Sequence, residues 1–319
     1  MKAFFSVIVK ILCILLTILL VLWAGLAIAR VIIYPDYVAN KETVCKIPAI
    51  HNGFTPQGVT HVADNTYIFS GYHGDELELY VSVNGESKKI IPVDANDDIW
   101  DLHGGGISVV KKNVYVTASK SLLIFDLDDL LNAQNEDRVA NVGEFKVDIK
   151  TSFCFANNET LYVGEFYDGE KYKTDVSHHF TTPSGEKHCA LAAAYTLGEN
   201  GMPLSESPDC YISIRDNVQG LAVRGNTFIL SSSYGLTSSE LDFYNGLTDN
   251  GSKVTISEQE YPLYYLDSAT HTKTVTMPAM SEGLDIVGDR VVILFESACN
   301  KYLFGKLFFA DKLVSYPIA

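Results

Sequence analysis

Five segments of this chain share one fourteen-residue template, and this repeat constrains the fold more than any other feature of the sequence. Each segment has the pattern of a short strand, a tight turn rich in Asn, Asp or Gly, and a second strand. The starts are 48, 47, 67 and 63 residues apart, which is the spacing of the four-stranded blades of a β-propeller. The repeat therefore predicts an all-β propeller with five blades. The segments begin at Gln57, Gly105, Ser152, Gln219 and Glu282.

Two other architectures fit the same pattern: a six-bladed ring with one diverged blade, and a β-sandwich. Closure into a ring is favoured because it removes most unpaired strand edges. Only 37 residues follow Glu282, too few for a full blade, so we expect the strand-like segment Lys46–Ile50 to complete the last sheet.

The longer repeats indicate where extra segments lie. We expect a short helical stretch at Asp128–Asp137 in blade two and an insertion at Tyr167–His188 in blade three. Blade four should continue, after an insertion near Asn245–Glu258, with outer strands. The expected outer strands of blades four and five are Tyr261–Asp267, Lys273–Met277, Lys306–Ala310 and Val314–Ile318.

An uncharged apolar run, Ile11–Ala29, precedes the repeats. Its nineteen residues are just long enough to span a hydrocarbon core as a helix. Lysines before the run and acidic residues after it place the N-terminus in the cytoplasm. A cleaved signal peptide ending at Ala27-Ile28-Ala29 is the alternative. We therefore expect a single-pass anchor in the cell membrane (1–30), a tether (31–45) and an extracytoplasmic propeller (46–319).

The charge of the chain excludes one class of partner. The net charge is −15, and the part after residue 30, with 21 basic and 39 acidic residues, carries −18. Nucleic-acid binding needs a basic surface, so no nucleic-acid partner is expected. An acidic surface is also what keeps many exported domains soluble.

The template starts are candidates for a metal site. In a propeller the innermost strands line a central channel, so their first residues should converge at one mouth. Side-chain oxygens around one axis suit a hard cation such as calcium. A water-filled structural channel and direct contact with substrate are the alternatives. The candidate ligands are Gln57, Ser152, Gln219 and Glu282.

Four residues are candidates for catalysis at the same mouth. His103 lies beside three glycines just before the second template, although a hydrogen-bonded loop histidine is the simpler interpretation. Glu165 and Glu296 end the second strands of their templates, and with Glu282 they could form an acidic cluster that acts as acid and base. Surface salt bridges to Arg215, Arg224 or Lys301 are the alternative for these glutamates.

Four groups of motifs carry a resemblance over about residues 50–305. They are T-P-Q-G from Thr55, H-G-G-G-I from His103, Q-G-L from Gln219 with L-S-S-S-Y-G, and M-S-E-G-L from Met280 with L-F-E-S-A-C-N-K-Y. This combination resembles an uncharacterised family of exported, membrane-anchored bacterial β-propellers. More distantly the chain is similar to calcium-containing propellers, namely the gluconolactonase, paraoxonase and strictosidine-synthase-like group and the calcium-activated nucleotidases. That resemblance implies one polar ligand per blade around a central calcium.

Two functions follow from these features. The first is a membrane-anchored propeller that binds a small-molecule or protein ligand at its channel mouth without catalysis. The alternative is a calcium-dependent hydrolase of the lactonase or nucleotidase type. No complete catalytic motif of a known hydrolase class is present in the sequence, which is why binding is placed first.

Overall fold

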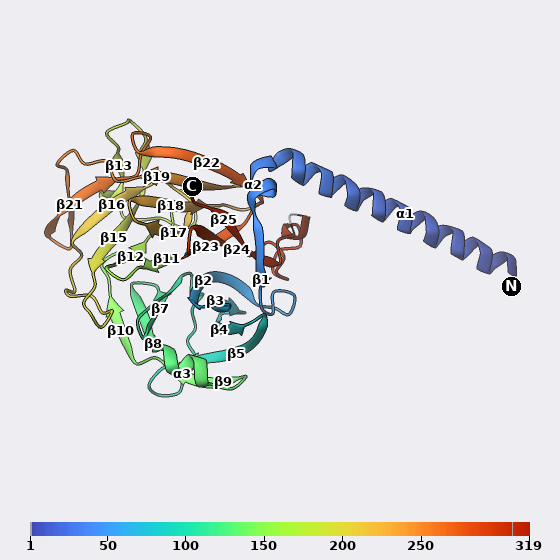
Figure 1. Ribbon diagram of the computed structural model, residues 1–319, viewed down its shortest axis with the longest axis horizontal. Coiled ribbons are helices and arrows are strands. Elements are labelled where there is room, and N and C mark those ends of the chain that lie inside the picture. Colours follow the sequence, from blue (N-terminus) through green and yellow to red (C-terminus); the bar gives the residue numbers. More distant parts are fainter. Residues whose placement is uncertain (1, 308) are drawn as a thin grey trace.

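The computed structural model describes residues 2–307 and 309–319, and its strands form five sheets arranged around a ring (Figure 1). Five innermost strands each contact the innermost strands of the two neighbouring blades, and the last contacts the first. The fold is therefore a closed five-bladed β-propeller, as the repeat predicts. In ring order the innermost strands are β2 (Thr55–Ala63), β6 (Ile107–Val110), β11 (Phe153–Ala156), β17 (Val218–Arg224) and β23 (Ser281–Val287).

Blades one and two are built from consecutive hairpins. The turn at Asn84-Gly85 has positive φ at both residues, as expected for an Asn-Gly hairpin. Helix α3 (Leu127–Asn132), capped by the Asp126 carboxylate, confirms the helical stretch expected after the third strand of blade two. Beyond their inner strands these blades contain β3 (Thr66–His73), β4 (Glu76–Val83), β5 (Glu86–Val93), β9 (Asp137–Ala140), β7 (Asn113–Ala118), β8 (Ser121–Asp126) and β10 (Gly143–Lys146).

Blade three is extended by a hairpin that the sequence pattern assigned to blade four. Strand β21 (Gln259–Tyr265) pairs in parallel with β16 (Cys210–Ile214), and β20 (Lys253–Ile256) lies beyond it. The expected insertion between blade-three strands carries η1 (Val176–His178). The other strands of blade three are β12 (Thr160–Gly164) and β15 (Ala190–Thr196), with the small ribbon β13 (Phe180–Thr181) and β14 (Lys187–His188) in the insertion.

Blade four takes its third strand from an earlier segment than predicted. That strand is β19 (Ser239–Asn245), between β18 (Thr227–Ser232) and β22 (His271–Met277). The assignment of Tyr261–Asp267 to blade four was therefore wrong. An amphipathic strand pattern shows that a strand forms but does not show which exposed sheet edge it joins.

Blade five is closed by the N-terminal part of the chain. Strand β1 (Glu42–Lys46) pairs antiparallel with β25 (Lys312–Pro317), which pairs with β24 (Arg290–Phe295). The closing strand thus lies four residues earlier than Lys46–Ile50, because Pro48 offers no N–H and Ala49 has positive φ. The expected strand Lys306–Ala310 is also wrong, since residues Gly305–Leu307 form the short helix η2.

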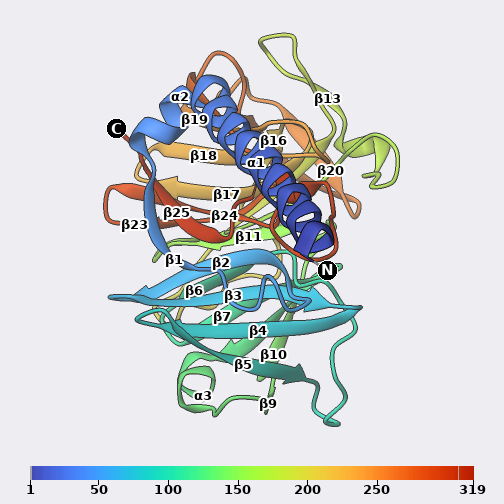
Figure 2. The same ribbon diagram turned by 90° about the vertical axis from the view of Figure 1, so that its right-hand side faces the viewer.

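The long N-terminal helix α1 (Lys2–Ile33) projects from the propeller (Figures 1 and 2), and no residue of the most apolar 18-residue stretch within its apolar span Phe4–Ile33 is buried. It is long and apolar enough to cross a membrane or to act as a signal anchor. Helix α2 (Pro35–Asn40) follows and packs on β22 and β25, with Tyr34 and Tyr37 buried in the core between blades.

A repeated hydrogen bond joins neighbouring blades around most of the ring. In each case a side-chain oxygen of the fourth template residue in one blade accepts a hydrogen bond from the backbone N–H of the fifth template residue in the next blade. Asp285 Oδ2 accepts from His61 N at 2.6 Å and from the Thr60 hydroxyl at 3.0 Å. The Thr60 hydroxyl accepts from Val109 N at 3.1 Å, and Ser108 Oγ accepts from Ala156 N at 2.7 Å. These bonds connect blade five to one, one to two, and two to three.

Replacing Asp285 with Ala should lower the free energy of unfolding by about 2–4 kcal/mol, because the buried His61 N–H and Thr60 hydroxyl lose their acceptor. Chemical denaturation of both proteins measures this difference. The control is Asp289→Ala, an exposed position in the next turn, with an expected change within about 0.5 kcal/mol. Equal effects of the two substitutions would contradict a closing role for Asp285.

Candidate functional site

The inner strands approach one another so closely that glycine is required at the axis. A Cβ on Gly283 would lie 2.9 Å from the Cα of Gly58, and a Cβ on Gly106 would lie 2.5 Å from the backbone nitrogen of Cys154. No other residue fits at such distances. Backbone atoms of neighbouring blades are therefore in close contact around the axis, and a cavity lined by the template starts lies at one mouth.

This cavity, the mouth pocket, has a volume of about 480 Å³, within the range of small-molecule sites. All five template starts line it, together with His103 and Glu296. The structure thus brings together, in one pocket, residues that are up to 239 positions apart in the chain. The template starts in its lining are Gln57, Gly105, Ser152, Gln219 and Glu282.

Two buried carboxyl groups meet in the mouth pocket. Glu282 and Glu296 are 2% and 7% exposed, and a hydrogen bond joins their side chains. Gln57 Nε2 donates to Glu296 Oε2 at 2.9 Å. Burial and the neighbouring Glu296 raise the pKa of Glu282 well above its usual range. Burial raises the pKa of Glu296 to about 7, although Lys301 opposes the shift. The pair therefore holds a shared proton near neutral pH.

A cation and two rings form the pocket wall beside this pair. The Lys301 ammonium donates to the Tyr72 hydroxyl and lies 4.6 Å from the centroid of that ring. The His103 imidazole stacks on Tyr72, with centroids 4.0 Å apart and planes at 13°. Desolvation and the positive charge of Lys301 lower the pKa of His103, so this ring is neutral at pH 7.

The opposite wall is aromatic. Phe166 contacts Tyr172 edge to face, with ring centroids 5.5 Å apart, and lies 6.3 Å from the Tyr234 ring. Tyr172 and Tyr234 are each 44% exposed and line the pocket, and the Lys171 ammonium lies 5.0 Å from the centroid of the Tyr172 ring. Sequence reasoning missed this wall as well as Tyr72 and Tyr302. Two motifs carried a signal: L-S-S-S-Y-G contains Tyr234, and the N-K-Y end of the last motif contains Lys301 and Tyr302.

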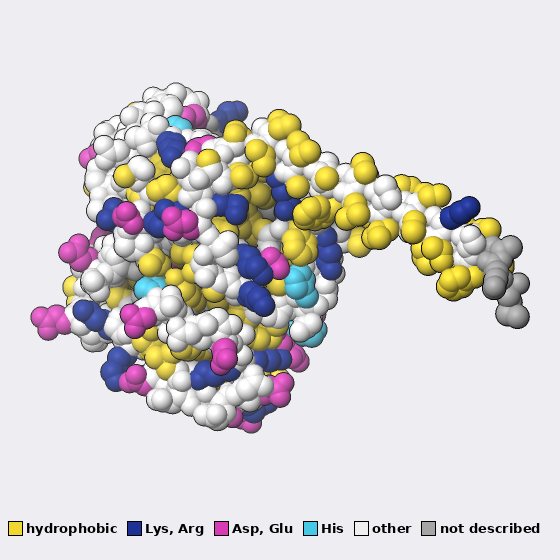
Figure 3. All heavy atoms as spheres, turned by 45° about the vertical axis from the view of Figure 1, so that its right-hand side comes forward, with side chains coloured by type: hydrophobic (Ala, Val, Ile, Leu, Met, Phe, Trp, Pro, Cys, Tyr) yellow, Lys and Arg dark blue, Asp and Glu magenta, His cyan; other side chains and the backbone are white. Residues whose placement is uncertain are grey.

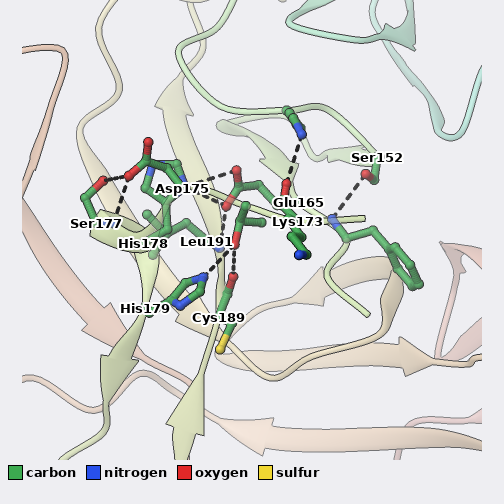
Figure 4. Close-up of polar contacts among 12 residues, drawn as sticks. Ser152, Glu165, Lys173, Asp175, Ser177, His178, His179, Cys189 and Leu191 are labelled. Carbon is green, nitrogen blue, oxygen red and sulfur yellow. Dashed lines mark hydrogen bonds and ion pairs between the residues drawn. The ribbon is translucent and has the colours of Figure 1, made fainter. Parts of the chain in front are cut away.

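Of the predicted site residues, Ser152 lies in the mouth pocket and Glu165 lies outside it. The Ser152 hydroxyl lines the mouth pocket but accepts a hydrogen bond from Phe166 N at 3.1 Å (Figure 4). Glu165, 1% exposed, lies outside the mouth pocket and accepts from His178 Nδ1 at 2.9 Å and from Leu191 N at 3.1 Å. These two side chains line a second cavity of about 470 Å³. The acidic cluster at the mouth therefore has two glutamates rather than three.

The calcium prediction meets a mixed donor set. Gln57, Gln219 and Glu282 offer oxygens, but within residues 2–307 and 309–319 no group of three or more His, Cys, Asp or Glu side chains is arranged to hold a metal. The Glu282–Glu296 hydrogen bond also places a proton where a cation would have to bind both carboxylates. The residues fit calcium only after this proton is lost, and calcium stays a prediction.

The carboxyl pair predicts a pH-dependent stability. The pKa of Glu296 rises from an ordinary 4.5 to about 7 on folding. Protonation of Glu296 therefore stabilises the folded state below pH 4.5, and this stabilisation is lost as pH rises through 7. The unfolding free energy of the wild type should fall between pH 5 and 8. In Glu296→Gln this fall should be smaller by about 3 kcal/mol.

Denaturation at each pH measures this effect, with the exposed Glu260→Gln as control. Burial also raises the pKa of Asp285, to about 6. The unfolding free energy of wild type and of Glu296→Gln should therefore both depend on pH below pH 6. Identical slopes above pH 6 in wild type and Glu296→Gln would contradict the shared proton.

Comparison with known proteins identifies no family. No protein-family profile matches the chain, and no curated protein sequence is similar to it. Solved structures that are similar include β-propellers at low identity. U3-55K is 7% identical, with 88% of this chain and 98% of that chain covered and a TM-score of 0.44.

Two further similar structures are bacterial. Myxococcus xanthus glutaminyl cyclase is 10% identical over 87% of this chain and 94% of that chain, with a TM-score of 0.38. BamB from Moraxella catarrhalis is 10% identical over 82% of this chain and 84% of that chain, with a TM-score of 0.32. At these values the similarities carry no argument about function, and the relationship to calcium-containing propellers stays a prediction.

Proposed function

We propose that this chain is a membrane-anchored, extracytoplasmic β-propeller that binds a small polar ligand in the mouth pocket. The observation that carries the proposal is the buried, hydrogen-bonded pair Glu282 and Glu296 on the wall of a cavity of about 480 Å³. Helix α1 supplies the anchor, and the acidic propeller sequence that follows it suits an exported domain.

The carboxyl pair favours a functional site over a purely structural one. Two carboxyl groups buried side by side are unfavourable to folding, since both lose hydration and Glu296 raises the pKa of Glu282. The bonds around the propeller axis use Asp285, Thr60 and Ser108 and do not need this pair. Strongly shifted titratable groups in a cavity are characteristic of binding and catalytic sites.

The pocket wall indicates the chemistry of the ligand. The carboxyl pair offers acceptor oxygens, Lys301 offers a cation, and the neutral His103 offers a further polar atom. Phe166, Tyr172 and Tyr234 present ring faces on the other side. A small molecule with several hydroxyl or amide groups and one flat face, such as a sugar or a nucleoside, matches both walls.

A thermal-shift screen of the full chain against sugars, nucleosides and aromatic acids tests the proposal. A true ligand should raise the melting temperature, since binding to the folded state alone gives about 2.7 kcal/mol at 100 times Kd. Its affinity should fall at least tenfold in Glu296→Gln and Lys301→Met and should be unchanged in Glu260→Gln. A screen without hits, or hits unaffected by the two pocket variants, would argue against the mouth pocket as a binding site.

The second candidate function is a calcium-dependent hydrolase. Its support is the same pair of carboxyl groups beside the amides of Gln57 and Gln219. Calcium should then compete with the shared proton and raise the melting temperature more at pH 8 than at pH 5. The control is Glu282→Gln, in which this effect should vanish. A melting temperature independent of calcium at both pH values would exclude this alternative.

A further inference from the structure

An exposed apolar loop lies between strands β24 and β25 of blade five. Its members Leu303, Phe304, Leu307 and Phe309 are 76%, 64%, 51% and 47% exposed. Single apolar side chains on a surface need no explanation, but four large ones within seven positions mark an interaction site. We refer to these four residues as the apolar loop.

The apolar loop lies beside the end of helix α1. Arg30, in the last turn of α1, donates from Nη2 to the carbonyl oxygen of Leu307 at 3.1 Å. Phe309 stacks on His51, with ring centroids 5.8 Å apart. Arg30 directly follows the uncharged run that ends at Ala29, so it marks the level at which a spanning helix leaves the hydrocarbon. The apolar loop is held at that same level.

Positive charges surround this contact. A cleft of about 130 Å³ between α1, α2 and β25 is lined by Arg30, Lys41 and Lys312, with Asp311 as its acidic member. Arg30 Nε is buried and has no hydrogen-bond partner among the described residues. Lys306 extends from the apolar loop itself, and its ammonium donates to Asn300 Oδ1 at 2.8 Å.

The apolar surface of α1 and this region are continuous. Figure 3 shows apolar side chains along the helix and on the part of the propeller that the helix approaches, with Lys and Arg side chains next to them. Apolar side chains flanked by cations are the arrangement found where a protein surface enters the boundary between lipid headgroups and acyl chains.

We propose that the apolar loop is a second membrane contact, inserted in the headgroup boundary of the leaflet where α1 emerges, with the nearby cations facing lipid phosphates. The inference rests on the proposed anchoring by α1. The occupant is the lipid surface, because a membrane held by α1 is already adjacent to Leu307 through Arg30. A protein partner or a second copy of the chain would cover the apolar loop without contact to lipid.

The contact also orients the mouth pocket. Lys301 and Tyr302 line that pocket, and Leu303 directly follows them in the chain. Gly305 lies against Met280, another residue of the pocket lining. Insertion of the apolar loop would therefore hold the blade-five wall of the mouth pocket at the bilayer surface and fix the tilt of the propeller.

Tryptophan fluorescence of the full chain in nanodiscs with brominated lipid tests the contact. Three single-tryptophan proteins are compared. Trp100 is replaced in all three, and Trp23 is also replaced in the second and third. One keeps Trp23 in α1 as the anchor reference, one carries Phe304→Trp, and one carries Leu204→Trp. Leu204 is 71% exposed, close to the exposure of Phe304, in the loop between β15 and β16 on the far side of the propeller from α1 (Figure 1).

Brominated lipid should quench Trp23 and the tryptophan at position 304 at least twofold and leave the one at 204 unchanged. Quenching of Trp23 without quenching at 304 overturns the second contact while the anchor stands, and it leaves a protein partner as the occupant. Equal quenching at 304 and 204 means non-specific adsorption and also overturns it. Unquenched Trp23 overturns the anchoring itself.

Discussion

Close contact of five inner strands at the axis is the constraint on which the rest of the structure depends. Gly58, Gly106 and Gly283 allow backbone atoms of neighbouring blades to approach below the distance that any side chain tolerates. This contact brings the inner strands close together around the axis, and the mouth pocket lies at one end of it. The bonds from Asp285, Thr60 and Ser108 then hold the blades in ring order, and the hydrophobic core fills the spaces between blades.

The mouth pocket is a consequence of that closure. Its lining combines the template starts with side chains from other positions, such as Glu296, Lys301 and Tyr72. Two of the three predicted glutamates reach this position. Because both are buried, their mutual repulsion is relieved by a shared proton instead of by solvent. Lys301 is near enough to moderate this effect without neutralising it.

Sequence patterns predicted the inner hairpins well because each depends on residues close in the chain. The examples are the five template hairpins β2–β3, β6–β7, β11–β12, β17–β18 and β23–β24. The same reasoning failed for strand β21, which left blade four for the edge of blade three, and for the closing strand, displaced by Pro48. Both errors concern which edge or register a strand takes, and that choice is made by contacts between distant segments.

The sequence by itself determined the number of blades, the apolar run before them and the position of each inner hairpin to within two residues, since these are local and periodic properties. Only the tertiary structure decided that Glu296 meets Glu282 while Glu165 turns to His178, and that the apolar loop lies against the end of α1. The physical reason is ring closure: it joins side chains such as Gln57 and Glu296, 239 residues apart, whose pairing no local pattern encodes.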